Sequence, residues 1–191
     1  MTSPLLSRRA LALRLAAVPA ALCAAARAPR AADAMVASVT PDAGGLSRSS
    51  ESIHQEVRFD AGRGRVFEAL TSSTQFDAVT RLSDALALVT APGAKSTSIS
   101  PEVGGPFTLF GGYITGRNLE LLREQRLVQA WRTVRWKAGD YSIVKFVLVE
   151  DGAATQLIFD HRGFPEGEGS HLAEGWHVHY WEPLSKYLHQ T

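Results

Sequence analysis

The sequence predicts one α+β domain, in which a bent antiparallel sheet wraps over a long C-terminal helix. Between about residues 106 and 160, short apolar-rich segments are interrupted by turn residues at intervals typical of an antiparallel meander. Near the C-terminus, large apolar side chains recur every three or four residues and form one stripe of a helix. A stripe this apolar must pack on another surface, and the sheet is the only partner large enough.

The N-terminal segment, residues 1–34, differs in composition from the rest of the chain. Arg8 and Arg9 precede an Ala/Leu-rich stretch, and residues 32–34 supply small side chains at a cleavage site. This pattern is typical of a twin-arginine export signal. We therefore predict a periplasmic or secreted protein. If Met35 is instead the true start, the leader is not part of the protein and a cytoplasmic location is expected.

Residues 35–51 are rich in Gly, Ser and Pro and show no periodicity, so they are predicted to be a flexible lead-in to a domain over 52–191. The chain has 20 basic and 19 acidic residues, which argues against a nucleic-acid binder. Its one cysteine, Cys23, excludes an internal disulfide and a cysteine-rich zinc site. No apolar run reaches the roughly 20 residues of a membrane-spanning helix.

The domain is expected to open with a strand at 53–59, where apolar and polar residues alternate. Apolar residues at helical spacing over 66–70 predict a following helix, with Asp60 as its N-cap. A second short helix is predicted over 73–79, and 84–89 fits a third.

Five further strands are predicted, at 106–110, 113–122, 126–136, 141–150 and 155–160. Four residues share one face of the fourth of these: Ser142, Val144, Phe146 and Leu148. The apolar stripe of the last helix consists of Ala173, Trp176, Tyr180, Leu184 and Leu188. Pro183 lies inside this helix and should bend it, because proline lacks a backbone donor.

The order of elements and several motifs resemble the SRPBCC (START-like) superfamily and, within it, the C-terminal domain of activators of the heat-shock protein 90 ATPase. The motifs are RVFEALT at 65–71, GGPFTLFGG at 104–112, ITG at 114–116, RLVQAWR at 126–132, HRGFP at 161–165, GW at 175–176 and YW at 180–181. The resemblance implies a helix-grip fold. It also implies either a cavity for a hydrophobic small molecule or a chaperone-associated interaction module, and some superfamily members are cyclases or hydrolases.

Aromatic side chains on the central strand and the last helix are expected to face one another. The resemblance implies a ligand cavity between them, and the candidate lining residues are Phe107, Leu109, Trp131, Phe146, Trp176 and Tyr180. The alternative is that these side chains fill an ordinary core.

The histidines give little support for metal or acid-base chemistry. His177 and His179 point about 200° apart on a helix, and His171 is too far along the axis to join either, so no metal site is expected. His161 is a weak general acid-base candidate, because Asp160 beside it should point to the opposite face of the strand. We expect His161 to cap the strand-to-helix turn instead. No catalytic residue and no cofactor are predicted.

The polar face of the middle strands is basic and carries Arg117, Arg123, Arg126, Arg132, Arg135 and Lys137. It is either a solvated outer surface or a docking surface for an acidic partner. The primary interpretation is a non-catalytic domain, a monomer or homodimer, that binds a hydrophobic small molecule. The first alternative is an interaction module for a protein partner similar to the chaperone activator. An enzyme comes third, with only His161 and Gln129 to nominate.

Overall fold

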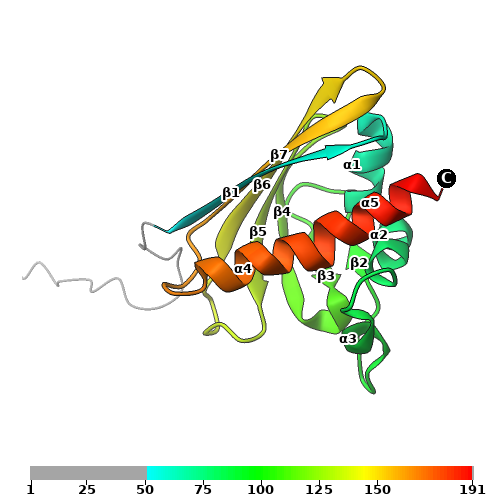
Figure 1. Ribbon diagram of the computed structural model, residues 1–191. Helices are drawn as coiled ribbons and strands as arrows, with labels where there is room; N and C mark the ends of the chain where they lie inside the picture. The colour runs from blue at the N-terminus through cyan, green and yellow to red at the C-terminus, as the bar shows by residue number, and fades with distance from the viewer. Residues whose placement is uncertain (1–50, 191) are drawn as a thin grey trace, which may run out of the picture. The chain divides into compact units, whose positions relative to one another are not determined.

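The computed structural model describes residues 51–190 (Figure 1). The predicted export signal lies outside these residues, as does the predicted lead-in except for its last position. The described strands are β1 (Ser52–Phe59), β2 (Ser98–Ile99), β3 (Pro106–Leu109), β4 (Ile114–Leu122), β5 (Arg126–Thr133), β6 (Ser142–Asp151) and β7 (Ala154–Arg162). The helices are α1 (Arg63–Thr71), α2 (Ser73–Thr80), α3 (Leu86–Thr90), α4 (Gly169–Trp176) and α5 (Glu182–His189), with a 3₁₀ turn η1 (Phe110–Gly112) and a π-helical segment η2 (His177–Trp181).

The strands form one antiparallel sheet in the order β1-β7-β6-β5-β4-β3-β2, which confirms the predicted meander. The first strand joins the last one, since β1 pairs with β7 along its whole length. The two-residue strand β2 was not predicted from the sequence. It extends the opposite edge of the sheet by pairing with β3. The C-terminal helix lies across one face of this sheet (Figure 1).

Burial alternates along the central strands, as the period of two requires. On β6 the predicted inner face is confirmed, because Ser142, Val144, Phe146 and Leu148 are all at most 4% exposed. The residues between them are half-buried or exposed on the outer face. Strand β5 ends at Thr133 rather than at the predicted position 136. The chain turns there, and Trp136 packs its ring 5.5 Å from that of Trp131.

The first helix starts later than the sequence suggested. Its N-cap is Gly62, in an extended conformation and without a side-chain cap, so the prediction of Asp60 as the cap is wrong. Asp60 instead accepts a hydrogen bond from Arg58 on β1. The second helix begins at Ser73, directly after the first, and the side chain of Ser72 caps it.

The C-terminal helix runs from Gly169 to His189 and changes register in its middle, where η2 separates α4 from α5. This irregularity lies next to Pro183, which cannot donate to the carbonyl of His179 four residues before it. A wider π turn at this point is a local adjustment to the missing bond. None of the helices within residues 51–190 is both long and apolar enough to cross a bilayer.

Candidate functional site

A cavity of about 290 Å³ opens beside the C-terminal helix. One wall is formed by α4 and η2, and the facing wall by the ends of β4 and β5. Phe110 of η1 and Leu88 of α3 complete the lining on a third side. The surface is mostly apolar; besides the hydroxyls of Tyr113 and Tyr180, its ionisable groups belong to Glu168, His171 and His179.

Three of the six predicted lining residues border this cavity: Trp131, Trp176 and Tyr180. The other three, Phe107, Leu109 and Phe146, are buried elsewhere in the core, so the predicted cavity position is corrected for them. Phe146, for example, packs 5.2 Å from Phe159 under the middle of the sheet. The cavity lies toward α3 and η1. Part of its lining therefore comes from turns and short helices, whose inward-facing residues a strand pattern does not predict.

Aromatic rings fill the space between the middle of the sheet and the helix. Trp176 is the centre of this packing, with ring centroids 4.2 Å from Tyr180, 4.4 Å from Phe159 and 5.5 Å from Trp131. Tilted and edge-to-face contacts between aromatic rings stabilise a core beyond the area that they bury. The aromatic stripe is therefore core on one side and cavity wall on the other.

His161 is completely buried and both of its ring nitrogens are hydrogen-bonded. The Trp176 indole Nε1–H donates to His161 Nδ1 at 3.0 Å. Because an indole nitrogen can only donate, the imidazole proton must be on Nε2, which lies 2.7 Å from the Ser142 hydroxyl oxygen. That hydroxyl then donates to the carbonyl of Trp131 at 3.0 Å. The chain of bonds fixes Trp176 against three strands.

The prediction that His161 caps a turn is wrong, because β7 continues to Arg162 and His161 faces inward. Burial lowers the pKa of His161 to about 3, so the ring is neutral at physiological pH. Its expected independence of Asp160 is confirmed, since that carboxylate lies on the outer face. The other nominated group, Gln129, is also buried and donates to Asn118 at 3.0 Å. Neither His161 nor Gln129 lines the cavity.

Three buried polar atoms of cavity-lining residues have no aligned hydrogen bond within residues 51–190: the Trp131 indole nitrogen, the Tyr180 hydroxyl and His179 Nδ1. Burial raises the pKa of Tyr180, and the nearby Trp131 N–H partly offsets this effect. All three atoms are shielded from water, and Tyr180 is a neutral phenol at any physiological pH. The wall that a ligand would meet is therefore uncharged at Trp131 and Tyr180 but still carries polar atoms.

The remaining histidines of the helix stay apart. His177 is exposed and pairs with Glu182 at 3.2 Å, whereas His179 lines the cavity with its ring 6.4 Å from that of Phe110. No three His, Cys, Asp or Glu side chains in the described part of the chain are placed to hold a metal ion.

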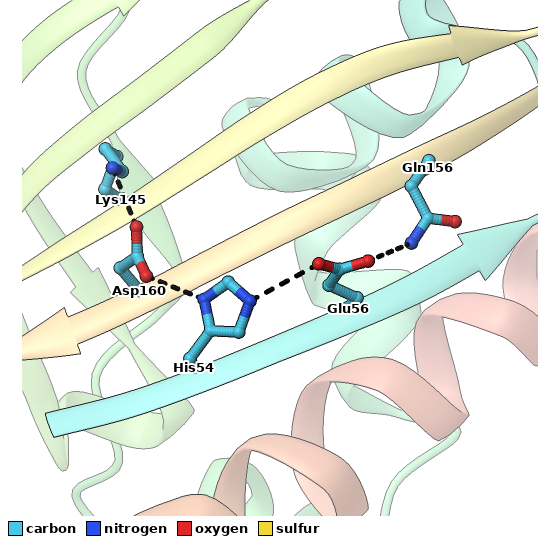
Figure 2. A network of polar contacts seen from close by, with 5 residues as sticks. All are labelled: His54, Glu56, Lys145, Gln156 and Asp160. Atoms are coloured by element: carbon cyan, nitrogen blue, oxygen red, sulfur yellow. Dashed lines mark hydrogen bonds and ion pairs between the residues drawn. The ribbon is translucent and has the colours of Figure 1, made fainter.

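The outer face of the sheet carries a second polar network (Figure 2). His54 Nδ1 lies 2.9 Å from Asp160, which also accepts from Lys145 at 2.7 Å. On its other side, His54 Nε2 lies 3.4 Å from Glu56, and Glu56 accepts from Gln156 at 3.1 Å. The hydrogen bond to Asp160, followed by that to Glu56, raises the pKa of His54. The sequence patterns gave no sign of this network, because its members come from three strands.

Comparison with known proteins assigns the sequence of this domain to a family. The family model described as "Activator of Hsp90 ATPase homolog 1-like protein" matches residues 60–189. The human protein "Activator of 90 kDa heat shock protein ATPase homolog 1" is 25% identical over 89 residues, which are 47% of this chain and 26% of that protein. The Dictyostelium discoideum homolog is 37% identical over 76 residues, or 39% of this chain and 20% of that protein. The chain thus spans about a quarter of the length of these curated relatives.

Solved structures share the fold. An HSP90 activator from Plasmodium falciparum superposes with a TM-score of 0.56 at 22% identity, covering 69% of this chain and 90% of that one. The Aha1 dimer from Colwellia psychrerythraea gives a TM-score of 0.56 at 16% identity, covering 72% and 96%. At these identities the likeness supports the helix-grip architecture, a curved antiparallel sheet closed by a long helix.

Proposed function

This chain belongs to the Activator of Hsp90 ATPase homolog 1-like family, and from that premise we propose that its domain binds a small apolar molecule in the cavity beside Trp131, Trp176 and Tyr180. The observation that carries this proposal is the cavity itself. The pocket is partly open to solvent, and about 290 Å³ of largely apolar space stays unfilled next to a densely packed aromatic core. Apolar walls of this kind favour an apolar occupant over ordered water.

The volume limits the size of the ligand. An engineered apolar cavity of about 150 Å³ holds one benzene molecule, so about 290 Å³ fits roughly two fused or linked rings. Ligands of this size, on the order of 15 non-hydrogen atoms, gain about 0.3–0.6 kcal/mol per atom. The expected dissociation constant is therefore micromolar or weaker.

Gly175 offers a direct test, because it lines the cavity from α4 and a Cβ added there would meet nothing within 4 Å. We expect Gly175→Phe to fill the cavity and to abolish binding of 1-aminonaphthalene, an uncharged fluorophore with two fused aromatic rings. Gly175→Ala is the matched control, since it changes the same position but leaves the volume open. Fluorescence titration of both variants against the unmodified protein measures the effect. Equal binding by the Phe variant would contradict the proposal.

Native mass spectrometry of protein purified from its source addresses the natural occupant. A retained lipophile that is present in the unmodified protein and in Gly175→Ala, but absent from Gly175→Phe, is the expected result. Detection of the bare chain in all three, together with no fluorophore binding, would remove the small-molecule function.

A second candidate function is an interaction module that acts on a heat-shock protein 90 type ATPase. It is favoured by the matches to curated activators of that ATPase, which are 25% to 37% identical over part of this chain. The test is the ATPase rate of the chaperone in the presence of excess protein. A changed rate supports this candidate, and an unchanged rate counts against it.

The N-terminus of the natural protein helps to separate the two candidates. We propose that residues 1–34 direct export, which would remove the protein from the compartment of a cytosolic chaperone. A mature start at Met35 in the periplasm favours small-molecule binding. A formylated Met35 in the cytosol contradicts the export proposal and favours the chaperone-associated function.

A further inference from the structure

Cations on the outer face of the sheet fall into two groups. Arg58 pairs with Asp60, Arg126 with Glu120 at 2.6 Å and Lys145 with Asp160 at 2.7 Å. The second group has no carboxylate within 4.0 Å among residues 51–190. We call this group the basic corner; it consists of Arg117, Arg132, Arg135, Lys137 and Arg162.

Strand register places the basic corner on one area of the sheet. Arg117 on β4 is opposite Ala130, Ala130 is opposite Ile143, and Ile143 is opposite Arg162 on β7. Adjacent strands are about 4.8 Å apart, so the two arginines lie about 14 Å apart with two apolar side chains between them. Arg132 stands on the outer face of β5, next to this row.

The loop after β5 adds the remaining charges. Arg132 Nη2 donates to the carbonyls of Trp136 at 2.8 Å and Lys137 at 3.0 Å, which holds this loop against the outer face. Its guanidinium also lies 5.7 Å from the ring centre of Tyr141. Arg135 and Lys137 are exposed, and Asp140, the acidic residue of the loop, forms no ion pair with a described residue. The guanidinium groups of Arg117 and Arg132 are thus held by neutral carbonyl oxygens, and their charge stays uncompensated.

We propose that the basic corner docks an acidic segment of a protein partner. The carboxylates of that segment would bind the arginines on either side, and its middle would lie over the apolar side chains between them. Charge complementarity selects the partner, because clustered like charges without counter-charges repel one another until an anion binds them. The half-buried Ala130 and Ile143 give the middle of the segment an apolar contact. This surface is on the opposite side of the sheet from the cavity, so the proposal is independent of the small-molecule function.

The rest of the outer face argues for a short peptide rather than a nucleic acid or an anionic membrane. The neighbouring row contains Lys145, Asp160 and His54, whose charges already compensate one another. Beyond it lies Glu56, whose carboxylate is 55% exposed. A phosphate backbone or a lipid surface would extend over these carboxylates and be repelled, whereas a segment of a few residues would not reach them.

Fluorescence anisotropy with a labelled hexapeptide, in which two leucines are flanked by two glutamates on each side, tests the proposal on the full chain at about 50 mM salt. We expect measurable binding and a loss of roughly tenfold or more in affinity for the double variant R117Q/R162Q. The matched control is K95Q/K186Q, which removes two exposed cations without ion pairs from elsewhere on the domain. Circular dichroism melting confirms that both variants fold.

Each outcome decides the proposal. Peptide binding that falls only in R117Q/R162Q supports the basic corner as the docking site. Equal losses in the two double variants would show a general charge effect and would overturn it, as would the absence of binding. Tighter binding of a ten-nucleotide thymidine oligomer, or of vesicles with phosphatidylglycerol, at the same salt concentration would assign the surface to a different class of partner.

Discussion

Two imidazoles only one strand apart behave in opposite ways. His54 on β1 and His161 on β7 belong to neighbouring rungs of the same strand pair, where His54 is opposite Asp160 and Ile53 is opposite His161. His54 lies in water between two carboxylates, and its pKa is raised. His161 lies in the dry core between an indole and a hydroxyl, and its pKa is lowered to about 3.

The difference shows that partners and solvent, rather than residue type, set the role of a histidine. Carboxylates favour the charged ring, whereas burial without a counter-charge disfavours it. The inner imidazole therefore acts as a fixed neutral link between Trp176 and Ser142. The outer one is a surface group whose charged form is favoured by its two carboxylate neighbours.

The largest expected effect comes from breaking the inner network at its aromatic end. Trp176→Ala removes the donor to His161 and leaves a void among Tyr180, Phe159 and Trp131. We expect the free energy of unfolding to fall by about 3–5 kcal/mol. Urea denaturation measures it. The control is Gln156→Ala in the outer network, for which a change within about 0.5 kcal/mol is expected; comparable losses in the two variants would contradict the distinction.

The next effect is a pH dependence. In the unfolded chain His161 binds a proton at a pKa of about 6.5, whereas the folded ring resists protonation down to about 3. Stability should therefore decrease as the pH falls from about 6.5 toward 3, with a contribution that approaches about 1.4 kcal/mol per pH unit. His161→Phe should lose this contribution. Urea unfolding between pH 4.5 and 7.5 measures the slopes.

His54→Gln sharpens the same experiment. Because the folded pKa of His54 is raised, its stabilisation is fully present below the unfolded pKa of about 6.5 and is lost as the pH rises through the folded value. The Gln variant should thus keep the acid loss due to His161 and lack only the stabilisation that His54 contributes below its folded pKa. Identical slopes for the unmodified protein and His161→Phe would refute the assignment of the acid loss to the buried ring.

The smallest expected effect concerns the outer network alone. Asp160→Asn removes the stronger hydrogen bond of His54, so the pKa of His54 should move down toward its ordinary value. The pKa of the neighbouring His161 should not change, because the side chains of Asp160 and His161 project from opposite faces of β7. NMR titration of both imidazoles reports each pKa separately. A matching shift in His161 would show that the two faces are coupled.

Local patterns in the sequence predicted the elements better than their ends or contacts. The alternation over β6 and the helical stripe through Trp176 were clear, because each depends only on the period of a single segment. Asp60 is not the cap because the first helix begins only at Arg63, which makes Gly62 the N-cap. The strand through Trp131 ended early because Trp136 folds back onto that ring.

The candidate site was predicted only in part for a related reason. The sequence could place three residues between sheet and helix, namely Trp131, Trp176 and Tyr180. Each lies on the face that the strand or helix period predicts to be buried, and each is buried in the structure. Phe107 and Phe146 share the same pattern, yet they are buried away from the cavity. Residues of α3 and η1 set the position of the cavity, and no periodic pattern describes those turns.

Sequence alone determined the α+β class, the inward face of each central strand and the apolar stripe of the last helix, because these follow from the spacing of apolar side chains along one segment. Only the tertiary structure decided the tautomer of His161, the place of the cavity and which arginines have no counter-charge. Each of these depends on atoms that other strands and helices bring together, such as Ser142, which is 19 positions from His161 in the chain and 2.7 Å from it in the fold.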